Sequence, residues 1–135
     1  MATASYGATV NVGELQGFTG PLESMIGAMS GGANLAVTEA NASGAYLQGT
    51  SNVIQGDSVC IDAAVAIAQA EKMVNDDNVM AIMGPNCSGN TGAVITNVLV
   101  PNGIVSISPS ATSPALTTLE AVSYTHLTLP TILLV

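Results

Sequence analysis

The sequence almost lacks positive charge. Its 135 residues include one basic side chain, Lys72, against nine acidic ones, which gives a formal net charge of −8. Proteins that bind nucleic acids or anionic membrane surfaces do so with Lys and Arg. We therefore expect no nucleic-acid partner.

Long apolar runs and a complete signal peptide are also missing. No run approaches the roughly 18 to 20 apolar residues of a membrane-spanning helix, so we expect no direct membrane insertion. The first residues, Met1 to Ala4, offer only an Ala-x-Ala fragment of the kind that ends a signal peptide. We interpret residues 1–8 as a residual leader or N-terminal tail.

Residues for catalysis or metal binding are scarce. The only histidine is His126, and the only cysteines are Cys60 and Cys87. Cys87 has no base to activate it outside the last residues of the chain, and two cysteines without a neighbouring Cys/His pair do not complete a zinc site. We expect no catalytic residue, no metal site and no cofactor. Cys60 and Cys87 are either a disulfide pair or two buried thiols.

The stretch from Asn78 to Thr91 is the most informative part of the sequence. An apolar run over 79–83 stops at Gly84-Pro85 and leads through small polar residues into a helical apolar spacing. This pattern predicts a buried strand that turns directly into a helix. The backbone N–H groups at such a helix start, capped by a Ser or Asn, attract anions such as a carboxylate. The same turn also occurs without a ligand, so this stretch alone leaves binding open.

A phosphate-binding loop is the other interpretation of these residues. Gly84 to Thr91 has the spacing of G-x-x-x-x-G-K-T, but Asn90 stands where the lysine is required. We therefore expect no nucleotide binding.

The rest of the chain alternates strand and helix patterns. Apolar runs predict further strands near 10–15, 52–55 and 104–107, and apolar positions three and four residues apart predict helices over 21–43 and 62–74. We expect Met25 and Met29 to fill the core. The alternation predicts an α/β fold, a parallel sheet with flanking helices. The polar loops at its carboxyl edge, where ligands bind in such sheets, are 16–21, 56–62, 84–91 and 108–114.

Residues 122–135 do not continue this rhythm. They are rich in Thr and Leu and resemble the translated product of a sequencing adapter. We predict that this segment is a non-native tail in which His126 and Tyr124 have no function, and that residues 9–121 are the genuine domain, which is incomplete.

Four motifs in order carry a family resemblance. The motifs are GELQGFTGPLESMIGAMSGGANLAVTEANASG, GDSVCIDAAVAIAQAEKMV, VMAIMGPNCSGNTGAV and IVSISPSATSPALT. Together they resemble the type I periplasmic solute-binding proteins of branched-chain amino acid ABC transporters. The resemblance implies two α/β lobes that close on a ligand, of which 9–121 would supply most of the Rossmann-like N-terminal lobe. It also implies a periplasmic or extracytoplasmic receptor, not an enzyme, that delivers a small amino-acid-like ligand to a membrane permease.

The resemblance also implies roles for single residues. Ser88, with Gly89, Asn90 and Thr91 at the helix start, would receive the ligand's carboxylate. Ser110 and Thr112 would face its ammonium group. Cys60 and Cys87 occupy positions that a disulfide joins in the family. Met25 stands where relatives often have an aromatic residue, so the resemblance does not fix a leucine-type pocket.

Two alternatives remain. The same fold could bind amide or urea ligands or act as a chemosensory receptor. A small flavodoxin-like enzyme or cofactor carrier would need a phosphate loop or a catalytic constellation, and neither is found in the sequence.

Overall fold

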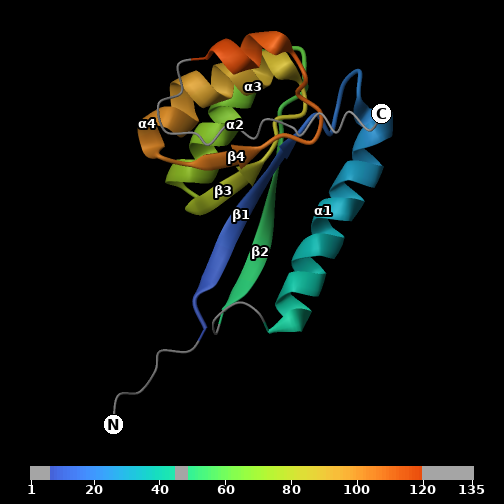
Figure 1. Ribbon diagram of the computed structural model, residues 1–135, viewed down its shortest axis with the longest axis vertical. Coiled ribbons are helices and arrows are strands. Elements are labelled where there is room, and N and C mark those ends of the chain that lie inside the picture. Colours follow the sequence, from blue (N-terminus) through green and yellow to red (C-terminus); the bar gives the residue numbers. More distant parts are fainter. Residues whose placement is uncertain (1–6, 45–48, 120–135) are drawn as a thin grey trace, which may run out of the picture.

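The computed structural model describes residues 7–44 and 49–119 (Figure 1). Most of the predicted leader and all of the predicted tail 122–135 lie outside the described residues.

The described residues form one parallel sheet of four strands in the order β2-β1-β3-β4 (Figure 1). The predicted parallel α/β fold is therefore confirmed. The strands are β1 (Thr9–Gln16), β2 (Thr50–Asp57), β3 (Val79–Met83) and β4 (Val105–Ile107). The register between β1 and β3 shifts at Asn11/Val12, where Met80 is skipped. This irregularity turns both Val79 and Ile82 into the core, although they are three residues apart.

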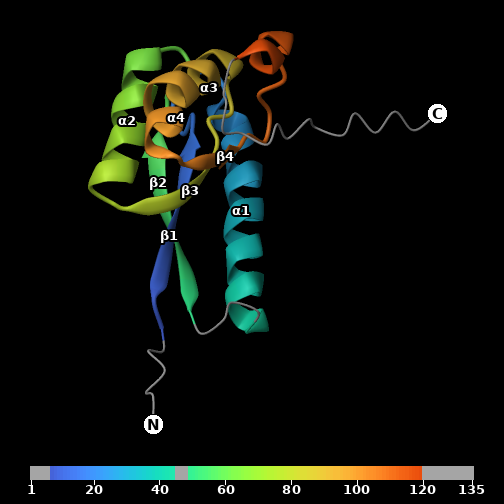
Figure 2. The same cartoon turned by 60° about the vertical axis from the view of Figure 1, so that its left-hand side comes forward.

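Helices cover the two faces of the sheet unequally. Figure 2 shows α1 (Glu23–Ser43) alone on one side, with α2 (Ala63–Asn75) and α3 (Ser88–Val94) on the other. The chain continues from α3 through a π-helical turn, η1 (Ile95–Leu99), and α4 (Val100–Asn102), and a 3₁₀ helix, η2 (Pro114–Thr118), follows β4. Asp62 caps α2, because its side chain accepts hydrogen bonds from the N–H groups of Ala64 and Val65. None of the helices in the described part of the chain is both long and apolar enough to cross a bilayer.

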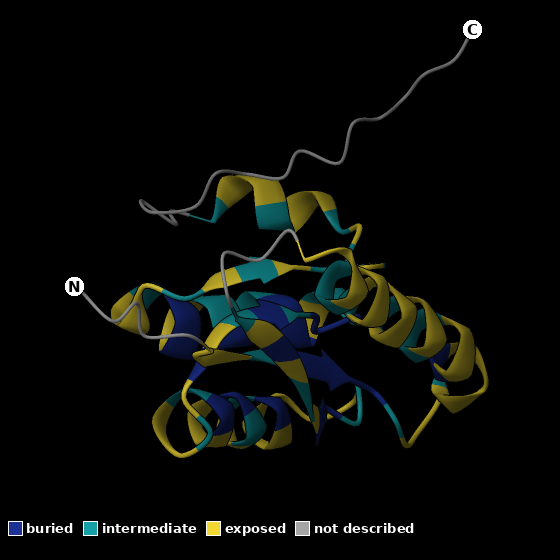
Figure 3. Cartoon of the chain, turned by 90° about the horizontal axis from the view of Figure 1, so that it is seen from below, coloured by how far each residue is buried: buried dark blue, intermediate teal, exposed yellow. Residues whose placement is uncertain are grey.

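The apolar core lies between the sheet and the helices on the α2 side. In Figure 3 the buried residues gather there, whereas most of α1 is exposed. The core residues are Leu15, Ala66, Ala70, Met73, Val79, Ile82, Val94, Val98 and Leu99. This packing fixes the four strand ends, and with them the loops of the carboxyl edge, relative to one another.

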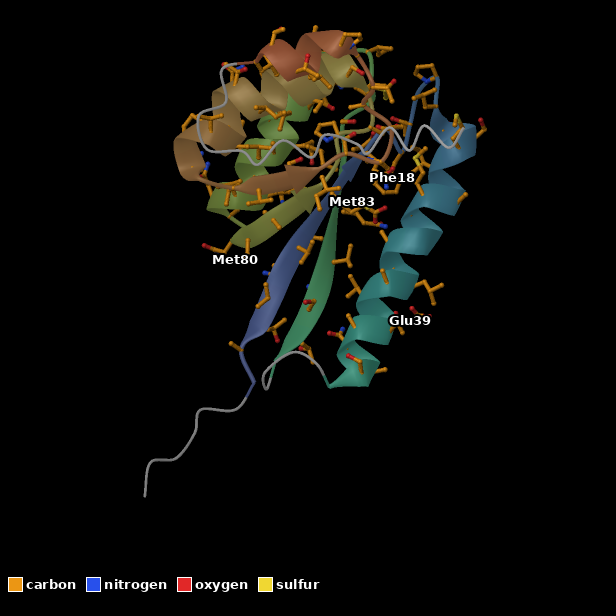
Figure 4. All side chains as sticks on the ribbon, viewed as in Figure 1. Phe18, Glu39, Met80 and Met83 are labelled. Atoms are coloured by element: carbon orange, nitrogen blue, oxygen red, sulfur yellow. A yellow bond between two sulfur atoms is a disulfide. The ribbon has the colours of Figure 1, made fainter. Side chains whose placement is uncertain are left out.

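The α1 side of the sheet is only partly covered. Ile26 is the one buried residue of α1. Met25 is 51% exposed, so the prediction that it fills the core is wrong, because the neighbouring Ile26 is the residue of α1 that is buried. Met80 is 67% exposed (Figure 4). Val105 and Ile107 are also exposed.

Candidate ligand-binding edge

The four loops at the carboxyl ends of the strands are joined by hydrogen bonds. After β1, the N–H of Gly17 donates to Asn86 Oδ1 at 3.0 Å, which links the first loop to the loop after β3. After β2, the N–H of Ser58 donates to the carbonyl of Gln16 at 2.7 Å. The loops after β1, β2 and β3 are therefore bonded to one another rather than forming separate turns.

The loop after β3 reverses against β1 through Gly84. Its φ is 112°, and a Cβ at this position would lie 1.8 Å from the carbonyl oxygen of Leu15. Only glycine fits there. The Gly84-Pro85 peptide bond is cis.

The loop after β4 folds onto the loop after β3. Ser108 Oγ donates to the carbonyl of Pro85 at 2.6 Å, and Ser110 Oγ donates to the carbonyl of Asn86 at 2.8 Å. The N–H of Ser113 donates to Ser88 Oγ at 3.2 Å. These bonds bring the two predicted ligand-binding segments side by side.

Ser88, Gly89, Ser110 and Thr112 share one corner of this edge. Gly89 and Thr112 are exposed, and Ser88 and Ser110 are half-buried. The residue before α3 is Cys87, whose side chain makes no capping hydrogen bond, so the expectation of a Ser or Asn cap is wrong. Because Cys87 is bonded to another cysteine, it leaves the first N–H groups of α3 without a side-chain cap.

The side chains of Asn90 and Thr91 serve the protein itself. Both residues are buried. Asn90 Nδ2 donates to the carbonyl of Ser58 at 2.8 Å, and Thr91 Oγ1 lies 2.9 Å from the carbonyls of Pro85 and Cys87. In this conformation both side chains hold the edge together and do not point to an open surface.

Cys60 and Cys87 form a disulfide with a Cα–Cα distance of 5.5 Å. The alternative of two free thiols is therefore excluded in this structure. Gly17 packs against this bond, and a Cβ there would lie 2.9 Å from Cys60 Sγ. The disulfide thus anchors the loop after β2 to the residue directly before Ser88, beneath the first loop.

Asp57 fastens the first loop to the second. Thr19 Oγ1 donates to Asp57 Oδ2 at 2.6 Å, and the N–H of Val59 donates to Asp57 Oδ1 at 2.9 Å. Partial burial acts to raise the pKa of Asp57. Hydrogen bonds from the Thr19 side chain and from the backbone of Val59, Thr19 and Phe18 outweigh it and lower the pKa below its usual value.

Asn86 is the residue of this edge that the sequence did not single out. It is buried, and it connects the loops after β1, β3 and β4 through its side chain and its carbonyl. The feature of the sequence that could have identified Asn86 is its position directly after Gly84-Pro85, since Asn commonly bonds neighbouring backbone in turns.

Comparisons with known proteins agree with this architecture. Residues 9–131 match the family described as periplasmic binding protein, a match that extends into the 122–135 segment. The chain is 34% identical over 104 residues to the Leu/Ile/Val-binding protein of Escherichia coli (strain K12), covering 69% of this chain and 28% of that protein. It is 30% identical over 110 residues to the Leu/Ile/Val-binding protein BraC3 of Rhizobium johnstonii, covering 82% and 29%.

A solved structure shows the same fold. The branched-chain amino acid transporter substrate-binding protein LivJ from Streptococcus pneumoniae, in complex with isoleucine, superposes with a TM-score of 0.74 at 34% identity, covering 82% of this chain and 31% of that one. The chain thus spans less than a third of the length of these relatives, which are named as amino-acid-binding or substrate-binding proteins. The chain belongs to the periplasmic binding protein family.

Proposed function

We propose that residues 9–121 form most of the N-terminal lobe of an extracytoplasmic receptor that delivers a branched-chain amino acid, or a related small zwitterion, to the membrane permease of an ABC transporter. The receptor acts by closing two lobes on the ligand, and no bond is made or broken. Relatives named as Leu/Ile/Val-binding proteins support this ligand class.

The proposal is based mainly on the arrangement of Ser88, Ser110 and Thr112, which share one corner of the edge. A hydroxyl and helix-start N–H groups without a side-chain cap lie next to a second loop that is rich in hydroxyls and carbonyls. Donors on one side suit a carboxylate, and acceptors on the other suit an ammonium group.

The proposed roles follow from which groups the fold leaves available. The carboxylate is received by Ser88 Oγ and by the N–H groups of Ser88 and Gly89. The ammonium group is received by the carbonyl of Ser110 and the hydroxyl of Thr112, because the hydroxyl of Ser110 is bonded to Asn86. Asn90 and Thr91 contribute through their position in the helix, because their side chains are bonded internally.

Other ligands must be weighed against this one. Structures with a similar fold, at 22% and 20% identity, hold 4-hydroxybenzoate and benzoate. Amide and urea ligands, and a chemosensory role, also remain compatible with the corner. A carboxylate is common to the amino acids and the benzoates, so the ammonium group is the feature that a test must resolve.

Calorimetric titration of the complete receptor tests the proposal. Leucine, isoleucine and valine are expected to bind, and benzoate, urea and a short amide are expected to bind much more weakly. Binding of urea or the amide in preference to every amino acid would overturn the assignment of the ligand.

A further inference from the structure

Glu14 is a buried carboxylate with no role in the proposed ligand corner, which is formed by Ser88, Ser110 and Thr112. It lies in β1 on the side of α1 and is 1% exposed. Its Oε1 accepts a hydrogen bond from Gln16 Nε2 at 2.6 Å. Its Oε2 accepts hydrogen bonds from Ser30 Oγ at 3.1 Å and Gln55 Nε2 at 2.9 Å. All three partners donate, so both oxygens of Glu14 act as hydrogen-bond acceptors, an arrangement that suits a carboxylate.

Within residues 7–44 and 49–119, no cationic side chain contacts Glu14. The sequence has one basic residue, Lys72, and its Nζ lies 2.6 Å from Asp77 Oδ2. That ion pair lies at the end of α2, before the start of β3, and so at the opposite end of the strands from the ligand corner. Buried charges are ordinarily paired because desolvation is costly, so Glu14 is an exception that calls for a reason.

Gln16 is bonded to Glu14 and lies nearer the carboxyl edge. It is the last residue of β1 and is fully buried. Its amide nitrogen is held by Glu14, whereas its Oε1 is buried and has no hydrogen-bond partner among the described residues. The amide dipole is therefore oriented with its negative end away from Glu14. The next residue, Gly17, is bonded to Asn86, two positions before Ser88.

We propose that Glu14, acting through Gln16, is a specificity-determining residue that favours ligands with a positive group over simple carboxylates. The inference rests on the proposed function and deepens it. The corner at Ser88 attracts a carboxylate of any kind. An uncompensated negative charge behind the same loops lowers the affinity of a bare anion and leaves that of a zwitterion nearly unchanged.

Burial reduces the screening of the Glu14 carboxylate. Water and salt screen exposed charges beyond about 10 Å, whereas buried charges are screened much less. Glu39 provides the contrast, because it carries the same charge on the exposed outer face of α1 (Figure 4).

The test compares leucine with 4-methylpentanoate, which has the same carbon skeleton without the amino group. Calorimetry on the complete receptor gives the ratio of the two dissociation constants. Glu14→Gln removes the charge and is expected to reduce the preference for leucine by roughly threefold to tenfold. Gln55→Lys leaves Glu14 in place and supplies the missing cation, so it is expected to reduce the preference in the same way.

Two further variants separate charge from structure. Glu14→Asp keeps the charge and loses the geometry, and Glu39→Gln removes an exposed charge. Both are expected to leave the ratio unchanged, even if Glu14→Asp weakens both ligands. A ratio that stays constant in Glu14→Gln while both affinities fall would make Glu14 purely structural and overturn the proposal.

The remaining outcomes also decide between the two proposals. If Glu14→Gln does not fold, Gln55→Lys decides, and an unchanged ratio there overturns the inference. If the unsubstituted receptor binds both ligands equally, the inference is wrong and the carboxylate corner stands. If it binds neither ligand, the proposed function fails and the inference fails with it.

Discussion

Ser88 lies at the point where the loops after β3 and β4 meet. Removing its hydroxyl therefore tests the proposed ligand site at the level of a single residue. Ser88→Ala in the complete receptor is expected to weaken binding of the preferred amino acid by about 1.5 to 3 kcal/mol, the range for a hydrogen bond to a charged group. Calorimetry measures the change. Ser24→Ala, on the exposed first turn of α1, is the matched control and should bind normally. Unchanged affinity in Ser88→Ala would remove this residue from the site.

The second prediction for a single residue concerns Asp57 and the pH dependence of the folding stability. Its pKa in the folded protein is lowered below the ordinary 3.8, so its ionised form is favoured by folding. This contribution to stability is fully present above pH 3.8 and is lost as the pH falls through the lower, folded pKa. Asp57→Asn should therefore be less stable than the unsubstituted chain near neutral pH, and the two should converge in acid.

Urea unfolding between pH 7 and pH 3 measures this difference. Asp76→Asn, which removes one carboxylate from the exposed end of α2, controls for the change in net charge. A difference between Asp57→Asn and the unsubstituted chain that persists unchanged at the lowest pH would contradict the account of Asp57.

Single residues also show the limits of the sequence. Ser88, Ser110 and Thr112 were predicted to share one site, and the structure brings them together, although their contact with a ligand stays a prediction. The internal bonds of Asn90 and Thr91 could not be predicted, because they depend on where the carbonyls of Ser58 and Pro85 lie in space. Glu14 was not singled out because a lone Glu in a strand pattern predicts a solvent-exposed position, and only the packing of α1 buries it.

At the scale of elements, the disulfide joins the loop after β2 to the start of α3. It links residues 27 positions apart, and closing a loop of that length stabilises a protein by about 3 to 4 kcal/mol in the chain-entropy model. The Cys60→Ala/Cys87→Ala double variant is expected to lose stability of that order in urea unfolding. Because Cys87 directly precedes Ser88, the variant should also bind the amino acid more weakly.

Intact-mass measurement after alkylation checks the state of the bond. Two thiols should react only after reduction. A reductant should destabilise the unsubstituted chain and leave the double variant unaffected. Reaction of both thiols in the oxidised protein would contradict the pairing.

Elements were easier to predict than their details. The apolar runs and Gly or Pro breaks placed β3 at 79–83, as observed, and the carboxyl-edge loops followed from the parallel order. The skipped Met80 and the π-helical turn η1 were not predictable. Neither interrupts the local apolar pattern, so no feature of the sequence indicates them.

At the scale of the whole molecule, the chain corresponds to only part of its relatives. The chain spans 28% of the Escherichia coli relative and 31% of the Streptococcus pneumoniae structure. Met80, Val105 and Ile107 are exposed, so the described sheet leaves some apolar surface uncovered. In the proposed mechanism the ligand's remaining polar groups are met by a second lobe, and closure excludes water from the contacts made here.

The 135-residue chain should therefore bind the preferred amino acid at least about 10-fold more weakly than the complete receptor. The estimate follows from losing one or more hydrogen bonds to charged ligand groups, each worth about 1.5 to 3 kcal/mol. Calorimetry on both proteins measures it, with near-ultraviolet circular dichroism and the intact disulfide as controls that the shorter chain is folded. A folded 135-residue chain that binds as tightly as the complete receptor would show that this edge forms the whole site, and lobe closure would then have no part in binding.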